Sequence, residues 1–429
     1  MMRLSGKLRS LFLPHLATFV SFSAIQVAQL LLPLLALPWL ARVLEPEAFG
    51  LLMYMSVISV IIGLIMDWGF ALGAVRKAAA SRGQERALAD LLGQVLSAKI
   101  LLMAGCLLGS LALLPLLPHA SAHPGAYGIA VLAGLSRGVN PTWFFQGIGE
   151  GMRRMACWDV CSSALVLVLT FVCVHAAVDW PRYLMLTAFC KGLAYLWLTL
   201  GLTRRYRISL CLIEGWRALG RTKTLFASVL SALIYNNGAQ LVLGFFLSPA
   251  QIGMLMAADK IVRAVVSVSN PVTQTLFPEI CALRGARPAQ AACMLRWSLA
   301  GTALVMLCAT AVVWLAAPLL VRIALGTAYS GTVPVLRIMA FLAPILACNF
   351  VLGTQTLVSF GQERALTITQ AVAGALSLPM AAFLGHYWGL TGGACLPLLV
   401  EGGIFIGLAW SVLRFCPSAF FSRTEKGVY

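Results

Sequence analysis

Apolar runs long enough to cross a bilayer follow one another along almost the whole chain, and this restricts the fold more than any other feature. A transmembrane helix needs about 20 consecutive apolar residues. Only 10% of the residues are charged, against about 25% in an average soluble domain, and a membrane β-barrel would show short alternating segments instead. The sequence therefore predicts an all-α integral membrane protein. Its twelve predicted spans cover approximately residues 16–41, 47–71, 91–114, 125–148, 157–177, 183–203, 225–247, 250–275, 297–320, 333–357, 364–384 and 389–413.

The basic residues show which side of the membrane each loop faces. Arg3, Lys7 and Arg9 precede a first apolar run that is too long for a signal peptide, so we expect a retained helix. With the N-terminus placed in the cytoplasm, 22 of the 31 Lys and Arg residues fall in cytoplasmic segments and three in the opposite loops. This distribution follows the positive-inside rule and predicts that both termini are cytoplasmic. It also places most of the net charge of +17 against anionic lipid headgroups, so no nucleic-acid partner is needed to explain it.

Six basic residues lie within predicted spans, where a charge is costly. Each costs about 2.5–3.5 kcal/mol near the bilayer centre on insertion scales. The acids within spans are fewer, so internal pairing cannot neutralise every cation. The surplus predicts a water-filled cavity with a positive potential, which favours an anion. The basic residues are Lys99, Arg137, Lys191, Lys260, Arg263 and Arg337, and the acids are Asp67, Asp159, Asp259 and Glu401.

One short sequence motif occurs twice in the chain. "VLEPEAFGLLMYM" at 43–55 and "FLSPAQIGMLMAA" at 246–258 align at an offset of 203 residues. Each copy lies at a predicted outer turn and opens an even-numbered helix, and six spans stand on either side of a basic stretch. This pattern predicts two parallel six-helix lobes, residues 1–210 and 225–429, with a cytoplasmic joint at 211–224. The aligned pairs are Leu44 with Leu247, Pro46 with Pro249, Gly50 with Gly253 and Met53 with Met256.

Several stretches resemble one family when they are taken together and in order. "LARVLEPEAFGLLMYM" and the following "DWGFALGAVRKAA" resemble the opening of Wzx-type polysaccharide flippases, which belong to the multidrug/oligosaccharidyl-lipid/polysaccharide exporter superfamily. "NPTWFFQGIGEGMRR" at 140–154 is similar to the end of that family's fourth helix, and "IGMLMAADKIVRAV" at 252–266 to its eighth. The resemblance covers essentially the full chain and implies a fold like that of multidrug and toxin extrusion (MATE) transporters.

The resemblance implies a role in the bacterial inner membrane. Such proteins carry undecaprenyl-diphosphate-linked oligosaccharide from the cytoplasmic to the periplasmic leaflet, for O-antigen, capsule or exopolysaccharide synthesis. The implied partners are this lipid-linked cargo, membrane lipids, a glycan polymerase and chain-length proteins. The charge argument agrees with this role, because a diphosphate is an anion. We expect a secondary transporter that is not an enzyme and uses no cofactor, with H+ or Na+ as the candidate coupling ions.

Five cations are candidates to contact cargo in the cavity. Arg263 follows Asp259 by four residues, so these two form either a local ion pair or a phosphate contact whose strength Asp259 adjusts; guanidinium geometry suits phosphate. Arg137 has no acid within a turn, whereas Arg337 is near a helix end, from which it can snorkel. Lys99 is expected to snorkel and is not a candidate. The five candidates are Arg137, Arg263, Lys260, Lys191 and Arg337.

Three acids are candidates for ion coupling or gating. Glu401 lacks a local cation and, like Asp259, is a candidate carrier of a proton or sodium. For Asp67 we expect a helix-end or gate contact with Arg76 rather than ion coupling. The twelve cysteines include no C-x-x-C pair and are interpreted as small packing residues, so no metal site is expected.

Two rival classes remain beside the flippase hypothesis. A drug/cation antiporter on the same fold carries cationic cargo, which an excess of buried positive charge disfavours. A membrane glycan polymerase or ligase is expected to carry a large catalytic outer loop, and every outer loop here is short. A lipid II flippase is a related alternative, for which two additional C-terminal helices are expected. No G-x-x-x-x-G-K phosphate loop is present, so ATP is not the predicted energy source.

Overall fold

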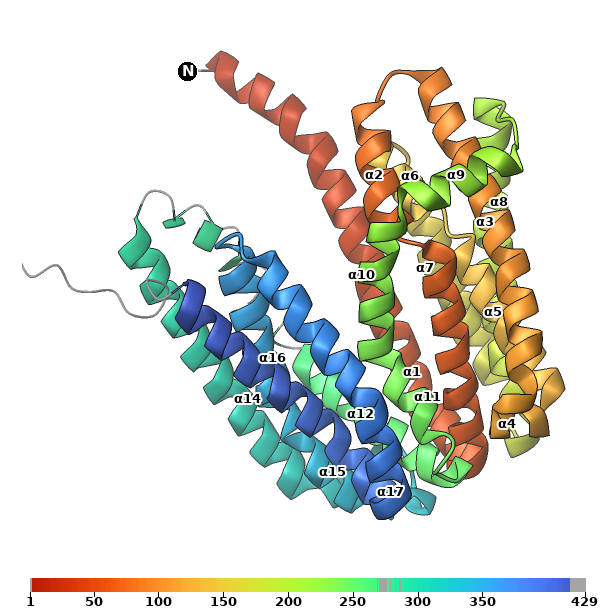
Figure 1. Ribbon diagram of the computed structural model, residues 1–429, viewed down its shortest axis with the longest axis vertical. Helices are drawn as coiled ribbons and strands as arrows, with labels where there is room; N and C mark the ends of the chain where they lie inside the picture. The colour runs from red at the N-terminus through yellow and green to blue at the C-terminus, as the bar shows by residue number, and fades with distance from the viewer. Residues whose placement is uncertain are drawn as a thin grey trace, which may run out of the picture. The chain divides into compact units, whose positions relative to one another are not determined.

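The computed structural model describes residues 2–267 and 287–416, and between them residues 269, 276–277, 279–281 and 283–284. Every regular element in this part of the chain is helical (Figure 1). The residues separate into two compact units, unit 1 from Met1 to Leu233 and unit 2 from Ile234 to Tyr429.

Unit 1 is built around its first helix. α1 contains two helical stretches that meet at Glu45, whose left-handed backbone (φ 59°) breaks the helix. The second stretch ends at Asp67, before Trp68 and Gly69, which also have positive φ. The other elements are α2 (Phe70–Ala80), α3 (Glu85–Leu113), η1 (Leu114–Leu116), α4 (Pro118–Ala122), α5 (Pro124–Gly138), α6 (Thr142–Ile148), α7 (Met152–Cys173), η2 (Ala177–Asp179), α8 (Trp180–Tyr206), α9 (Leu212–Arg221) and α10 (Lys223–Leu233), after α1 (Met2–Asp67).

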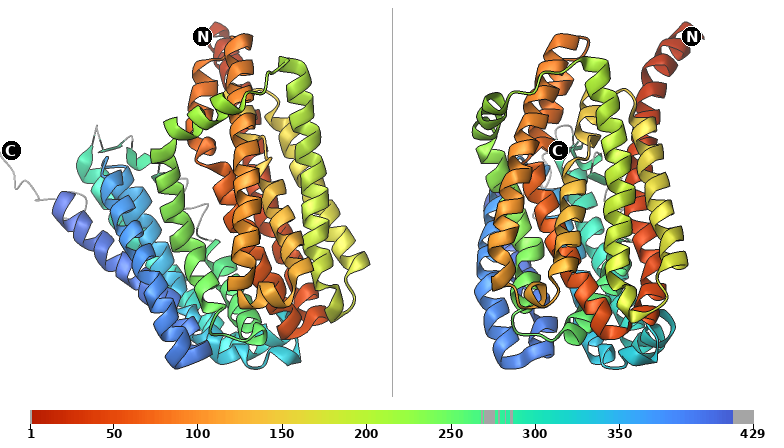
Figure 2. Two further views of the ribbon diagram at one scale, coloured as in Figure 1. Left: turned by 45° about the vertical axis from the view of Figure 1, so that its right-hand side comes forward. Right: turned by 90° about the vertical axis from the view of Figure 1, so that its right-hand side faces the viewer.

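The core of unit 1 forms where α1 packs against α5 and α7, and where α5 packs against α8. These helices run side by side in both orientations of Figure 2. The α9 helix packs on α3 through Gly215, where an added Cβ would lie 2.6 Å from the Ser97 carbonyl carbon. Leu219 of α9 accepts a hydrogen bond from the Trp68 indole at 3.2 Å, and Trp68 stacks on Phe226 with ring centroids 3.6 Å apart. The predicted joint region is thus packed onto unit 1.

Unit 2 differs from unit 1 in containing two π-helical stretches among its described residues. A π-helix is rare and accommodates an extra residue per turn. The first packs against α17, and the second packs against α16 and α17. The elements are η3 (π, Ile234–Gly238), α11 (Ala239–Leu243), α12 (Pro249–Ser267), α14 (Pro288–Ala324), η4 (Thr327–Tyr329), α15 (Thr332–Ala340), α16 (Leu342–Phe350), η5 (π, Val351–Val358) and α17 (Glu363–Phe415), which bends at Gly389 (φ 51°).

The predicted fold class is confirmed: the protein is an all-α membrane protein with about twelve spanning helices. Seven helical stretches of the described chain are long and apolar enough to cross a membrane. Helices α1 and α17 each contain most of two predicted spans, which meet near the breaks at Glu45 and Gly389. The end of the predicted span 250–275 lies outside the described residues, because α12 is described to Ser267. The boundary between the units falls inside the seventh predicted span, later in the chain than the predicted joint at 211–224.

The repeated motif, at 43–55 and 246–258, occupies equivalent places in the two units. Pro249 is the first residue of α12, and Pro46 directly follows the break at Glu45. Proline suits a helix's first turn because its missing N–H has no intrahelical partner there. Leu44 and Leu247, which precede the two prolines, are both buried. Both copies therefore begin a helix and anchor its start in the core of its own unit.

Candidate functional site

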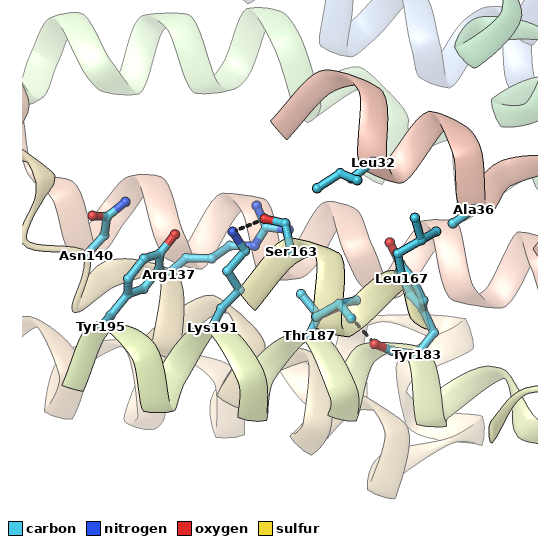
Figure 3. Close-up of a pocket in the computed structure, with 11 residues that line it drawn as sticks. Leu32, Ala36, Arg137, Asn140, Ser163, Leu167, Tyr183, Thr187, Lys191 and Tyr195 are labelled. Carbon is cyan, nitrogen blue, oxygen red and sulfur yellow. Dashed lines mark hydrogen bonds between the residues drawn. The ribbon is translucent and has the colours of Figure 1, made fainter. Parts of the chain in front are cut away.

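A cavity of about 390 Å³ opens within unit 1, lined by residues of α1, α5, α7 and α8 and by the turn after α5. Figure 3 shows two cations on its wall, Arg137 from α5 and Lys191 from α8. Tyr183, Thr187 and Ser163 add hydroxyl groups. The remaining lining residues are Leu32, Ala36, Asn140, Val166, Leu167 and Tyr195. The wall thus combines positive charge, hydroxyl groups and an apolar side.

Small residues fix the position of Arg137 against α1. An added Cβ at Gly134 would lie 2.6 Å from the Ile62 Cβ, and one at Gly138 would lie 2.3 Å from the Met66 Cβ. Close helix approach through a G-x-x-x-G pair is a common device in membrane proteins, because packing rather than water drives their association. On the α1 side, a Cβ at Gly63 would lie 3.2 Å from that of Arg137. This close approach holds the base of the Arg137 side chain.

No described residue pairs with the charge of Arg137. It forms no ion pair and no hydrogen bond with the residues that the structure describes, and its side chain is exposed. Lys191 and Arg137 act on each other electrostatically, so two positive charges face one space. A guanidinium has five N–H donors in a planar fork. Arg137 therefore offers unused donors to an anion that enters the cavity.

Lys191 differs from Arg137 because α7 uses its donors. Its Nζ donates to Asp159 Oδ1 at 2.9 Å, to the Asp159 carbonyl at 3.1 Å and to Ser163 Oγ. An ammonium has three donors, so these three acceptors satisfy it. Asp159 is fully buried, and its Oδ1 also accepts from the Tyr195 hydroxyl at 2.5 Å. Asp159 is therefore the buried counter-ion of Lys191.

The end of α5, beside the cavity, is held by another buried cation. Lys99 of α3 donates to the Gly138 carbonyl at 2.5 Å and to the Asn140 carbonyl at 3.4 Å. The expectation that Lys99 snorkels to the surface is wrong: it is 5% exposed because the free carbonyls at a helix C-terminus attract a cation. Asn140 Oδ1 in turn accepts from the Thr142 backbone N–H at 2.9 Å and starts α6. Its amide nitrogen bonds to no described residue and can donate to a ligand in the cavity.

In unit 2 the expected ion pair on α12 is present. Arg263 Nε donates to both carboxylate oxygens of Asp259, at 2.9 and 2.8 Å. The Asp259 side chain is 7% exposed and that of Arg263 46%, so the guanidinium extends to the border of a small cavity of about 70 Å³ that both residues line. The Nη groups of Arg263 bond to no described residue.

Glu401 of α17 lies in a closed hydrogen-bond cluster. Tyr235 donates its hydroxyl proton to Oε1, and Asn349 donates Nδ2 to Oε2 at 2.8 Å and to the Glu401 backbone carbonyl at 3.0 Å. Glu401 is 8% exposed. Neutral donors thus satisfy a buried carboxyl group, and it forms no ion pair within the described part of the chain.

The other predicted residues lie apart from these sites. Lys260 is on the exposed side of α12. Arg337 lies over the Trp314 ring, 4.7 Å from its centroid, and donates to the Trp314 carbonyl at 3.3 Å. Asp67 ends α1 and has Lys99 as its charged neighbour. The contact expected between Asp67 and Arg76 is not among the ion pairs of the described residues.

A match to one protein-family model shows the family of this chain. Residues 16–283, more than half of the chain, match the model described as "Polysaccharide biosynthesis protein". The chain belongs to this family. Two proteins named "Putative O-antigen transporter" are similar to it: one of Escherichia coli (strain K12) is 25% identical over 84% of this chain and 87% of its own length. The other, of Shigella dysenteriae, is 24% identical over 85% of this chain and 91% of its own length. The resemblance inferred from the sequence is confirmed.

Solved structures confirm the fold of this polysaccharide biosynthesis protein. An inward-facing MATE-family multidrug transporter of the MOP superfamily matches with a TM-score of 0.64 and 16% identity, over 94% of this chain and 98% of its own. The lipid II flippase MurJ in an inward closed conformation matches with a TM-score of 0.68 and 12% identity, over 95% and 89%. At these identities the likeness concerns the fold alone.

Sequence reasoning missed the Asp159–Lys191 pair, although a signal for it was present. The two residues stand sixteen positions either side of His175, in the turn between α7 and α8. Residues equally distant from the turn of an antiparallel helical hairpin lie at the same depth, so this pairing was readable. The "GLSRG" stretch at 134–138 was a second missed signal, because its glycines mark where α5 approaches α1.

Proposed function

We propose that this protein carries undecaprenyl-diphosphate-linked oligosaccharide across the bacterial inner membrane by alternating access, for O-antigen, capsule or exopolysaccharide synthesis. One observation supports the proposal most: Arg137 faces a polar cavity inside a membrane protein, and no described residue pairs with its charge. A charge in that position is costly unless water or an anionic ligand compensates it. Membership of the polysaccharide biosynthesis family and the names of the two relatives support the same cargo.

The cavity wall fits the head of such a cargo. Arginine forms paired hydrogen bonds with phosphate oxygens, and Arg137 has its donors free for this. The hydroxyl groups of Tyr183, Thr187 and Ser163 and the amide of Asn140 are neutral partners of the kind that bind sugar hydroxyls. The lipid tail needs no protein cavity, because it can stay in the bilayer. The protein's contribution is a wet, positive path for the head alone.

The rival cargo, an organic cation, is disfavoured by the same wall. No acidic residue is among the described residues that line the cavity. Asp159 is the nearest candidate, and Lys191 and Tyr195 occupy its carboxylate. A cation that entered would meet Arg137 and no free negative charge. The antiporter hypothesis would need a carboxylate that this cavity does not present.

For energy coupling we propose Glu401 ahead of Asp259. Both were candidates from the sequence, but Arg263 neutralises Asp259 through two hydrogen bonds. The described donors to the Glu401 carboxyl group, Tyr235 and Asn349, are neutral, so Glu401 can gain or lose a proton, or take up a sodium ion, without breaking an ion pair among the described residues. The test is export measured at varied pH and Na+ concentration. A Glu401→Gln variant that keeps the wild-type dependence on both ions would exclude this role.

Export in a deletion strain tests the proposal. We expect Arg137→Ala to lower surface polysaccharide about 10- to 100-fold, because a charged hydrogen-bonded contact is worth about 1.5–3 kcal/mol, while the protein reaches the membrane at the wild-type level. Arg137→Lys should retain part of the activity, since it keeps the charge and loses the planar fork. Arg263→Ala should also impair export. Arg322→Ala, an exposed cation in a predicted outer loop, is the control.

One outcome contradicts the mechanism. If Arg137→Ala and Arg263→Ala both restore full export, no cationic cavity carries the cargo.

The proposed partners have a separate test in the gene neighbourhood. Glycosyltransferases and a glycan polymerase encoded beside this gene would support the pathway, and the kinds of glycosyltransferase would indicate the glycan.

We propose the cytoplasmic position of both termini from the charge distribution alone. Reporter fusions at each end would test it.

A further inference from the structure

An apolar groove of about 600 Å³ runs between the two halves of α17, on either side of the bend at Gly389. Ile368, Val372 and Leu376 line it from the first half, and Leu399, Gly403 and Gly407 from the second. It lies wholly within unit 2 and is separate from the cavity that holds Arg137. The proposed cargo path makes no use of it.

Two cations mark one end of this groove. Arg364 lines it and is exposed. Arg414 is also exposed and lies over Trp410 and Phe415, 5.1 and 5.7 Å from their ring centroids, and both rings line the groove. This end is the one that the charge distribution assigns to the cytoplasmic face. The groove is thus apolar along its length and positive at its membrane-surface end.

The glycines explain why the groove is open. At Gly407 an added Cβ would lie 2.8 Å from Thr369 Cγ2, so the two helices touch there. One turn away, a Cβ at Gly403 would have nothing within 4 Å. The helices are therefore held together at one level and leave a gap at the next. A side chain at position 403 would fill that gap without a clash.

We propose that this groove is a binding site for an anionic phospholipid, with its phosphate at Arg364 and Arg414 and an acyl chain along Ile368, Val372 and Gly403. Basic pockets between transmembrane helices on the cytoplasmic side are typical sites for anionic lipid headgroups. A tryptophan at the same end suits the headgroup level. The lipid-linked cargo is a poorer occupant, because its diphosphate would lie at the surface and not in the cavity of unit 1.

Lipid retention by the purified full chain tests this site. Native mass spectrometry would compare phosphatidylglycerol with phosphatidylcholine of identical acyl chains. We expect phosphatidylglycerol to be retained preferentially. Arg364→Gln and Arg414→Gln should each weaken its retention about fivefold, since one Arg near an anionic lipid contributes about 1 kcal/mol. Arg287→Gln, an exposed cation at the start of α14, should leave retention unchanged.

Filling the groove tests the acyl-chain part of the site. Gly403→Phe should reduce the retention of phosphatidylglycerol, while Gly301→Phe should not, because Gly301 is an exposed glycine of α14 with equally open space. Equal retention of the two lipids, or full retention in the Arg364→Gln/Arg414→Gln double variant, would overturn the proposal. Loss with the arginine variants but not with Gly403→Phe would overturn the groove as the chain's place. Export activity is not the readout, so this result is independent of the proposed cargo.

Discussion

The two units hold their membrane-embedded charges in opposite ways. In unit 1 a carboxylate and a lysine neutralise each other beside a cavity of about 390 Å³, and an arginine is left over. In unit 2 an arginine and an aspartate pair on one helix, a glutamate is left over, and the cavity that the pair lines is about 70 Å³. Beside its ion pair, unit 1 thus holds an exposed arginine, and unit 2 an enclosed carboxyl group. Two lobes built on one plan therefore differ in the kind of group that stands outside the pair.

The largest expected effect is the loss of the Lys191 charge. Lys191→Ala removes the ion-pair partner of the buried Asp159, and removing one partner of a buried pair costs about 3–5 kcal/mol. We expect the variant to unfold at a clearly lower temperature in detergent and to accumulate poorly. Removing both charges, in Asp159→Asn with Lys191→Met, should recover most of the lost stability. A single variant as stable as the wild type would show that the pair is not formed.

Overpacking the α1–α5 contact should have the next largest effect. Gly138→Val places a side chain where even a Cβ would lie 2.3 Å from the Met66 Cβ, and overpacking costs about 1–3 kcal/mol. Thermal unfolding measures the loss. The matched control is Gly402→Val in unit 2, which has open space around its added Cβ and should be nearly neutral. Similar losses in both variants would contradict the close approach.

A smaller effect is expected in the glutamate cluster of unit 2. Glu401→Gln replaces one acceptor oxygen by an NH2 group, so either Tyr235 or Asn349 loses its acceptor, at a cost of about 1.5 kcal/mol. Unfolding in detergent should report this modest loss, in contrast to Lys191→Ala. Tyr235→Phe, which removes one of the same bonds, is the comparison variant. A loss as large as that of Lys191→Ala would mean that Glu401 has a charged partner.

The smallest expected effect concerns Arg337. Its guanidinium lies over Trp314 near a helix surface, and such a cation–π contact is worth about 0.5–1 kcal/mol. Arg337→Gln should lower the unfolding temperature slightly and leave export unchanged. Export lost as completely as in Arg137→Ala would place Arg337 on the cargo path and make the two units more alike than the described contacts indicate.

The sequence predicted the membrane fold well because hydropathy and charge act along the chain. The twelve spans, the repeated motif and the Asp259–Arg263 pair can all be predicted from residues that lie close together in the sequence. The site was predicted less completely. Arg137 and Lys191 were grouped as equivalent cations, and only the packing of α7 against α8 shows that Asp159 uses the donors of Lys191. The burial of Lys99 depends on the end of α5, 39 residues later. Contacts between helices decide which charges remain available.

The equal spacing of Asp159 and Lys191 from their shared turn has a consequence for biosynthesis. Because α7 and α8 are consecutive, the two can enter the bilayer as one hairpin, with its charges already matched. Insertion as a hairpin would spare either charge from meeting lipid alone, which costs several kcal/mol. Arg137 lies earlier, on α5, and no described residue neutralises it. Synthesis in this order would deliver the Asp159–Lys191 pair together, whereas Arg137 would need water as soon as α5 enters the membrane.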